Sequence, residues 1–272
     1  GNLISGTTSQ GSHVQNFDVN GNLTGSTDTS TDTSLNASGN VMSKSEHTST
    51  NGLDGNRLTS HDIWKSYGFQ GNVINSSDTI TTYGLYGNPL SSHGTSISYD
   101  QNGHKVNESE NSSTFDINGN ELTNYQKGTN YDTSGNVIGG YINDYTSTYD
   151  AKGRPLSSHQ VNSSVNNGVI IINNTFDQTS TYDTTGHQSI HSVNTYFDAQ
   201  GKKTGSDESD STSDGQGHQL TNHNVNTNYD AAGNKTASNV SDSTFTYDSN
   251  GRQLTGHSVN TSYDASANKT GS

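Results

Sequence analysis

The chain has 272 residues, a formal net charge of −14 and a sequence pI near 4.9. This acidity argues against nucleic acid and anionic membrane surfaces as partners, because both require basic patches. No apolar run is long enough for membrane insertion. Only 24% of the residues are apolar and none is cysteine, so we expect neither a large globular core nor a disulfide or thiolate site.

A turn motif recurs about every 16 residues, with Asp three positions before Gly in most copies. Asp accepts hydrogen bonds from turn amides, and Gly tolerates the positive φ that closes a type I turn with a bulge. No stretch has helical periodicity. The repeat predicts one continuous array of about seventeen strand-turn units over residues 1–272, cut from a longer polypeptide. In chain order the marker glycines are Gly1, Gly21, Gly39, Gly55, Gly71, Gly87, Gly103, Gly119, Gly135, Gly153, Gly168, Gly186, Gly201, Gly217, Gly233 and Gly251, with Ala267 in the next place.

Two columns of apolar residues flank the turns. We expect both columns to be buried between stacked units, as a thin continuous core. The fold class is therefore predicted to be all-β, either a β-solenoid or a fibre of stacked β-hairpins with 16-residue rungs. The column four positions before the glycine contains Phe17, Leu35, Tyr67, Tyr83, Tyr99, Phe115, Tyr131, Tyr149, Tyr182, Phe197, Tyr229, Tyr247 and Tyr263. The column three positions after it contains Ile4, Met42, Leu58, Ile74, Leu90, Val106, Leu122, Ile138, Leu156, Ile171, Leu220 and Leu254.

A longer period of about 32 residues alternates histidine with acidic residues. Stacked strands would place each histidine beside an acid, so we expect a ladder of hydrogen bonds or weak ion pairs along one face. Histidines two rungs apart would be ~9.6 Å distant, too far to share a zinc ion. The histidines are His61, His93, His159, His223 and His257, with His191 one place early; the acids are Asp78, Glu108, Glu110, Asp144, Asp207, Glu208 and Asp242.

The turn aspartates are the candidate metal ligands. If they are stacked in register, each must either cap its own turn amides or share a cation with its neighbours. The turn-cap interpretation is favoured and calcium is the alternative, because no EF-hand loop or calcium-binding nonapeptide is present. No other cofactor is predicted. These residues are Asp100, Asp116, Asp132, Asp150, Asp183, Asp198, Asp230, Asp248 and Asp264.

Catalysis requires a nucleophile, a base and an orienting group gathered in one place. Here Ser, His and Asp recur with the repeat and form no single constellation, and no known catalytic fingerprint is present. We therefore predict that the chain is not an enzyme.

The pattern Tyr-Asp-x-x-Gly followed by Asn, Arg or His resembles the YD repeat of the RHS family. In that family, YD units form a ribbon of β-hairpins that coils into a hollow shell around a toxin cargo or an empty cavity. The resemblance implies a shell segment of a secreted toxin. The units of this chain are shorter and more regular than those of the family, which favours a straight stack. The matching stretches are 99–104, 131–136, 149–154, 182–187, 229–234 and 247–252.

These patterns favour a structural extracellular or cell-surface protein: a fibre, a matrix filament or an adhesin stalk. Its partners would be copies of itself or neighbouring repeats of the same chain. The RHS-type shell is one alternative. Ice nucleation is another, because 16-residue units with Thr-x-Thr before an aromatic, as at 146–148, 179–181 and 244–246, are similar to bacterial ice-nucleation proteins.

Overall fold

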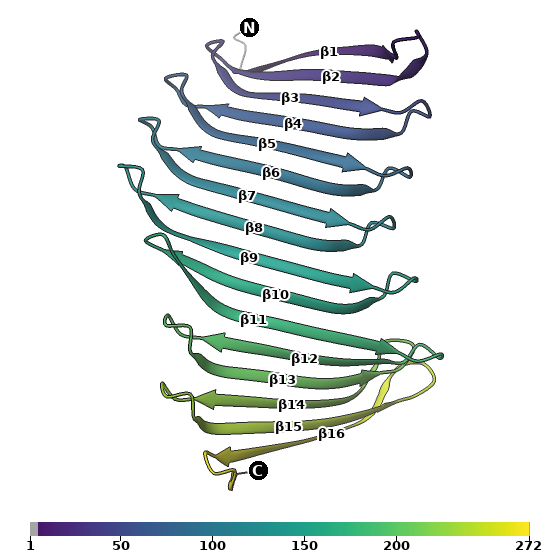
Figure 1. The fold of residues 1–272 in the computed structure, drawn as a ribbon, viewed down its shortest axis with the longest axis vertical. Coiled ribbons are helices and arrows are strands. Elements are labelled where there is room, and N and C mark those ends of the chain that lie inside the picture. Colours follow the sequence, from purple (N-terminus) through teal and green to yellow (C-terminus); the bar gives the residue numbers. More distant parts are fainter. Residues whose placement is uncertain (1–4, 272) are drawn as a thin grey trace. The chain divides into compact units, whose positions relative to one another are not determined.

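The computed structural model describes residues 5–271, which form strands joined by tight turns (Figure 1). The predicted all-β fold is confirmed, and this part of the chain has no helix with the length and apolarity needed to cross a bilayer. The strands are β1 (Ser5–Phe17), β2 (Leu23–Asn36), β3 (Val41–Asn51), β4 (Arg57–Tyr67), β5 (Val73–Tyr83), β6 (Pro89–Tyr99), β7 (Lys105–Phe115), β8 (Glu121–Tyr131), β9 (Val137–Tyr149), β10 (Pro155–Asn166), β11 (Val169–Tyr182), β12 (Gln188–Phe197), β13 (Lys203–Ser213), β14 (Gln219–Tyr229), β15 (Lys235–Tyr247), β16 (Gln253–Asp264) and β17 (Lys269–Gly271).

The strands group into two compact units. The first comprises Gly1–Ile142 with Val165–Val169, and the second comprises Asn143–Ser164 with Ile170–Ser272. In the first unit each strand from β1 to β8 pairs antiparallel with the next, and in the second unit the strands from β11 to β17 do the same. One 16-residue repeat is therefore one strand with its turn, and the 32-residue period is one hairpin. Of the two forms expected from the sequence, the hairpins are present.

The turns that begin with Asp are closed as their residues predict. Between β6 and β7, the amide of Asp100 donates to the carbonyl of His104 at 2.9 Å, and the amide of Gly103 donates to the carbonyl of Asp100 at 3.1 Å. The φ of Gly103 is 86°, in the left-handed region that favours glycine. Val106, three residues after this glycine, is the extra residue of a β-bulge, because the register shifts between Ser98 and Tyr99.

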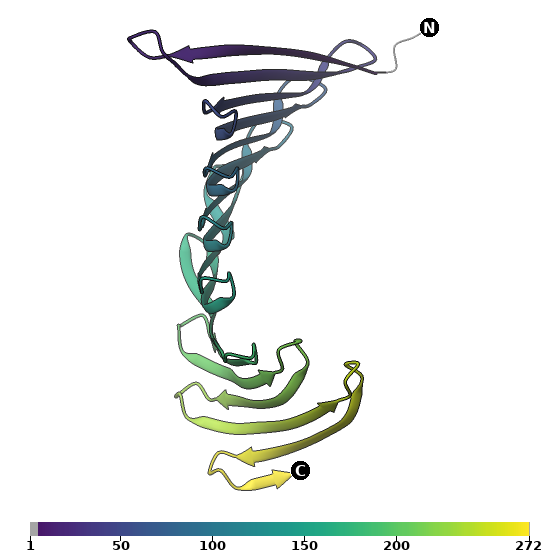
Figure 2. The ribbon, with the colours of Figure 1, turned by 90° about the vertical axis from the view of Figure 1, so that its right-hand side faces the viewer.

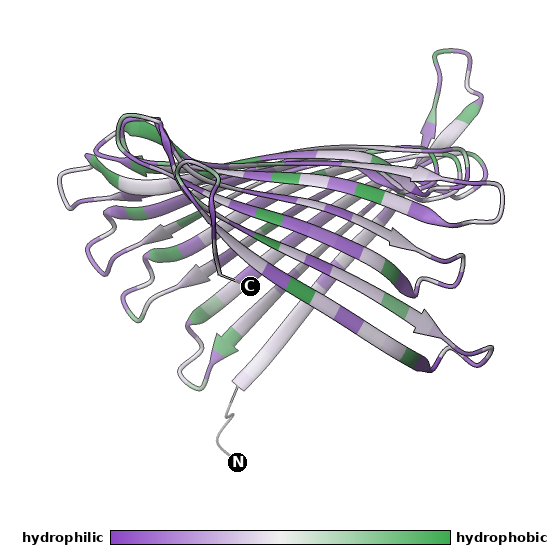
Figure 3. Cartoon of the chain, turned by 90° about the horizontal axis from the view of Figure 1, so that it is seen from below, coloured by the Kyte–Doolittle hydropathy of each residue, from purple (hydrophilic) through white to green (hydrophobic). Residues whose placement is uncertain are grey.

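The two apolar columns do not form a core, so that prediction was wrong. Among the described residues no apolar residue is buried. The reason is that the chain reverses direction at every turn. Tyr83 and Tyr99 are the last residues of the antiparallel strands β5 and β6. These equivalent positions therefore lie on opposite sides of the sheet, where the two sets of turns are, and do not stack on each other. The hydropathy colouring of Figure 3 shows apolar residues as separate short bands instead of a continuous stripe.

Apart from glycines, the buried residues of the described chain are small hydroxyl residues. Thr129 lies two positions before Tyr131, and Ser113 lies two positions before Phe115, on the same side of the strand as the ring. The hydroxyls of Ser60 and Tyr83 lie 3.2 Å apart, and no buried side-chain nitrogen or oxygen in the described chain lacks a hydrogen-bond partner. In a chain with so few apolar residues, the buried side chains are therefore hydrogen-bonded hydroxyls. The buried set is Ser49, Ser60, Ser113, Thr129, Ser147, Ser163, Ser180, Thr227 and Ser238.

Candidate functional site

The nine turn aspartates predicted from the sequence share one geometry. In each, Oδ1 accepts a hydrogen bond from the amide two residues on and another from the amide four residues on. For Asp132 the donors are the amides of Ser134 and Asn136, at 2.9 and 2.8 Å. Over the nine aspartates these distances span 2.8–3.0 Å.

The side chain that follows the turn glycine completes the cap in most copies. Asn136 donates from its amide to Oδ2 of Asp132 at 2.9 Å, and Arg154 donates from Nε to Oδ2 of Asp150 at 2.7 Å. The hydrogen bonds of the cap also lower the pKa of both carboxyl groups. At Asp214, hydrogen bonds from the imidazole of His218 and from turn amides lower the pKa of the carboxyl to about 2. Asp214 was not among the predicted residues, because no aromatic precedes it, although its Asp-x-x-Gly motif matches.

Consecutive turn aspartates of the first unit lie at opposite ends of the strands. In the first unit, Asp100 and Asp132 follow strands that end at one edge, and Asp116 follows a strand that ends at the other. Calcium usually takes six to eight oxygen ligands. Through Oδ1, each predicted aspartate already accepts hydrogen bonds from two amides of its own turn. Within residues 5–271, these aspartates form no cluster of three or more side chains that could surround a calcium ion.

Histidine and aspartate meet across neighbouring strands, as the 32-residue period predicts. His61 and Asp78 are 2.8 Å apart, and His223 Nδ1 lies 2.7 Å from Asp242 Oδ1. Four further pairs of this kind join residues that the sequence did not match to each other: His13 with Asp28, His47 with Asp62, His159 with Asp177, and His191 with Asp210.

Other members of the two predicted sets have other partners. His93 pairs with the Ser112 hydroxyl at 2.7 Å. Glu108 accepts from Lys105 and Tyr131, at 2.9 and 2.8 Å. Asp207 accepts from Tyr196 and from an asparagine of β14. The expected ladder is therefore present at some rungs and replaced by other hydrogen bonds at the rest.

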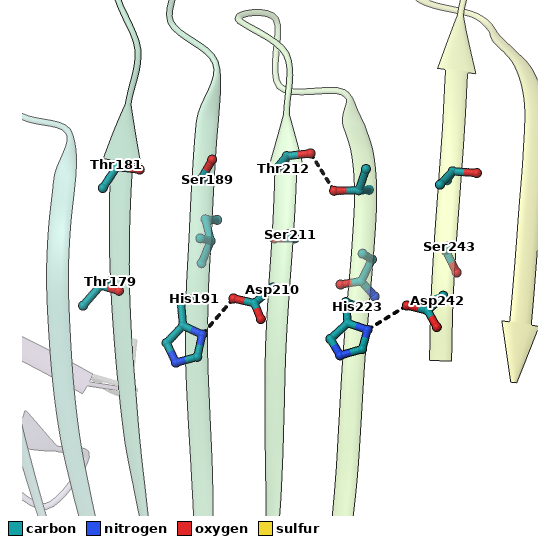
Figure 4. A pocket seen from close by; sticks show the side chains of 14 residues that line it. Thr179, Thr181, Ser189, His191, Asp210, Ser211, Thr212, His223, Asp242 and Ser243 are labelled. Atoms are coloured by element: carbon teal, nitrogen blue, oxygen red, sulfur yellow. Dashed lines mark hydrogen bonds and ion pairs between the residues drawn. The ribbon is translucent and has the colours of Figure 1, made fainter. Parts of the chain in front are cut away.

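Two of the pairs line a hollow in the second unit. Its volume is about 550 Å³, and its lining includes His191, Asp210, His223 and Asp242. These four residues are directly opposite one another on β12, β13, β14 and β15, and Figure 4 shows the four side chains in one row. Beside this row, the hydroxyls of Thr212 and Thr221 are 2.6 Å apart.

The chemistry of this row is that of proton and cation binding. Each histidine is hydrogen bonded to a carboxylate through Nδ1, at 2.8 Å for His191 and 2.7 Å for His223. Among the residues that line the hollow, both histidines are hydrogen bonded to carboxylates and neither to a serine hydroxyl. Imidazole nitrogen and carboxylate oxygen are, however, ordinary ligands for transition metals.

Comparison with known proteins gives no family. No family model matches the chain, and no curated protein matches it. Similar chains among solved structures include the Photorhabdus luminescens Tc holotoxin pore with TccC3 and the crystal structure of TcdB2-TccC3, each at 10% identity and a TM-score of 0.15. The alignments cover 94% and 93% of this chain but 17% and 22% of those chains, so the chain spans about a fifth of their length. A TM-score this low does not show a shared fold.

Proposed function

We propose that this chain is a structural, non-catalytic segment of an extracellular β-sheet wall, of the shell type that the YD-repeat motif implies. The observation that carries the proposal is the single layer of hairpins in each unit, with no buried apolar residue in the described chain. A solenoid encloses its core between opposite sheets of each coil. A single layer of hairpins instead suits a boundary between two compartments.

The bulges support a curved wall. They recur at the same place in successive hairpins, for example where the register shifts between Ser66 and Tyr67 and between Ser98 and Tyr99. A bulge bends its strand and increases the local twist. In the second unit the strands from β12 to β16 curve along their length (Figure 2). A ribbon with this built-in curvature fits the wall of a cavity better than a straight stack.

Exposed apolar side chains support contact with neighbouring repeats or with other copies of the chain. Val19, Leu53, Leu85 and Ile117 sit at turn tips along one edge of the first unit and are 61–101% exposed. Clustered apolar exposure of this kind marks interaction surfaces. We propose that these tips are covered by neighbouring repeats or by other copies of the chain.

A fibre is the second candidate, favoured by contacts that join successive turns along an edge. The side-chain amide of Asn56 donates to the Leu85 carbonyl at 3.1 Å, and the ammonium of Lys202 donates to the Ala231 carbonyl at 2.8 Å. Each contact ties one hairpin to the next. Such ties would resist tension along a filament.

Negative-stain electron microscopy of the intact parent protein separates the two candidates. The shell proposal predicts closed particles with a stain-filled or cargo-filled interior. Straight unbranched filaments would overturn it and establish the fibre. As a second readout, a protease added from outside should leave an enclosed segment intact in a shell, whereas a fibre offers no such enclosed segment.

A further inference from the structure

Three side chains on one face of the second unit are arranged as ligands for a metal ion. His191 on β12 and Glu208 and Asp210 on β13 each offer one ligand atom, and these atoms all lie within 4.8 Å of one another. In residues 5–271 no other group of three or more His, Cys, Asp or Glu side chains is gathered this closely. Zinc binds imidazole nitrogen and carboxylate oxygen at about 2.0–2.2 Å. Small side-chain rotations would bring the three ligand atoms to that distance from one ion. The side chains of His191 and Asp210 are 45% and 56% exposed, which leaves room for these rotations.

The strand register explains why these side chains meet. His191 lies directly opposite Asp210, and its Nδ1 is 2.8 Å from Oδ1 of that aspartate. Glu208 is two residues from Asp210 on the same strand, so both side chains emerge on the same face. A diagonal neighbour across an antiparallel pair is within reach of a side chain as long as glutamate.

The carboxylate of Glu208 has no competing partner in the described chain. Its direct neighbours are Val193 on β12 and Val225 on β14, and neither side chain can donate a hydrogen bond. By contrast Glu108, another acid on a strand, is bound by both Lys105 and Tyr131. The Glu208 carboxylate is therefore available for a ligand.

The other histidine–aspartate pairs provide an internal comparison. The residue two positions before the aspartate is Val240 for the His223 pair, Thr175 for the His159 pair and Ser76 for the His61 pair. A surface ladder of hydrogen bonds therefore forms without a second acid. Among the six cross-strand pairs, only the pair of His191 and Asp210 has an acid at this place.

We propose that His191, Glu208 and Asp210 bind a divalent transition-metal ion of the zinc class, with water completing the coordination. The ion would link β12 to β13 at the border of the hollow. Two histidines two strands apart are too distant to share an ion, but here the second and third ligands come from a single neighbouring strand. Calcium is disfavoured, because it prefers six to eight oxygen ligands and does not use imidazole.

Calorimetric titration of the 272-residue chain with zinc chloride tests the site. We expect Glu208→Gln and His191→Gln each to weaken the tightest zinc binding by at least about tenfold, since each removes one of three ligands. The matched control is His159→Gln, which removes the same imidazole from a pair on β10 and β11 that has Thr175 in place of the second acid, and it should leave that affinity unchanged. Val240→Glu supplies the missing acid beside His223 and Asp242 and should add a second site.

Three results would overturn the proposal. The first is absence of zinc binding up to about 1 mM, an affinity of only about 4 kcal/mol. The second is unchanged affinity in Glu208→Gln. The third is equal loss in His191→Gln and His159→Gln, which would mean that zinc binds to surface imidazoles in general. The substituted histidines and Glu208 are at exposed strand positions and Val240 is half-buried. An unchanged circular dichroism spectrum would confirm that each variant is folded.

Discussion

The close approach of β8 and β9 in the first unit can be tested with three glycine substitutions. Gly139 and Gly140 are consecutive on β9 and therefore face opposite sides of the sheet. A Cβ on Gly140 would lie 2.1 Å from the carbonyl oxygen of Gly128, whereas a Cβ on Gly139 would meet nothing nearer than the Val165 carbonyl oxygen, at 3.6 Å. The two positions therefore differ in the space available for a Cβ, but both are glycines on the same strand.

The magnitudes follow from these distances. At Gly140 the new carbon would be about 1.2 Å too close to a backbone oxygen, compared with the ~3.3 Å at which carbon and carbonyl oxygen normally meet in sheets. Because backbone cannot rotate away as a side chain does, Gly140→Ala should cost about 1–3 kcal/mol or more. Gly139→Ala should be neutral or stabilise by about 0.5–1 kcal/mol, since alanine loses less entropy than glycine in a strand.

Gly128→Ala provides the intermediate case. Its Cβ would lie 2.3 Å from the ring of Tyr141, a side chain that is 45% exposed and can swing outward. We expect a cost between those of the other two variants.

Thermal melts followed by circular dichroism measure the series. For a chain of this size 1 kcal/mol corresponds to roughly 2–4 °C, so a difference of about 1–4 kcal/mol between Gly140→Ala and Gly139→Ala should separate their melting temperatures by roughly 2–16 °C. Hydrogen exchange should show that the loss of protection is concentrated in β8 and β9. Equal melting temperatures for these two variants would refute the close approach of the two backbones.

Three further predictions concern the turns. Asp214→Asn keeps a cap, as Asn36 does naturally, but removes the charge. The pKa of Asp214 in the folded chain is lowered to about 2. The stability that the charged carboxylate contributes is therefore present above the unfolded pKa near 3.9 and is lost as the pH falls through 2. The melting temperatures of wild type and this variant should therefore differ at pH 7 and converge between about pH 4 and pH 2, and a gap that persists at pH 2 would contradict the assignment. Ala267 occupies the turn-glycine position with a φ of 64°. Replacing it with glycine should stabilise the hairpin by about 1 kcal/mol, and hydrogen exchange in β16 and β17 should become slower. Faster exchange would show that the alanine is not strained. Calcium should change the melting temperature by less than about 1 °C, and a large rise that a chelator reverses would show that the turn carboxylates do bind the ion.

The turns and the all-β class could be predicted because their causes are local. An Asp that accepts amides within its own turn and a Gly that supplies positive φ act over five residues, so the sequence contains the whole interaction. The side chain after the glycine, such as Asn136 beside Asp132, was visible in the motif but was not recognised as a donor to the carboxylate.

The partners of strand residues depend on how far each residue lies from the middle of its strand. In a hairpin, residues near the middle have partners about one repeat away, as in a stack of parallel coils; His61 and Asp78 are 17 positions apart. Residues near the ends do not: Thr50 pairs with Thr59, 9 positions away, and Ser60 with Tyr83, 23 away. The assumption that partners lie about one repeat apart therefore predicts the histidine and aspartate pairs, but it predicts wrongly that the aromatic columns stack.

The three ligands of the proposed metal site required the exact strand register. Glu208 and Asp210 are both acidic, and only the pairing of β12 with β13 shows that His191 is opposite one and diagonal to the other. A shift of a single residue would send both acids to the other face.

The hairpin also determines how such a gene can grow. Because each 16-residue repeat is one strand, gain or loss of a single repeat would reverse the direction of every later strand relative to the strands before the change. At the junction a histidine would then no longer face its aspartate. Gain or loss of two repeats restores every direction and every pairing. Unequal recombination should therefore be tolerated in steps of 32 residues, and length variants of this array in natural populations should differ by whole hairpins.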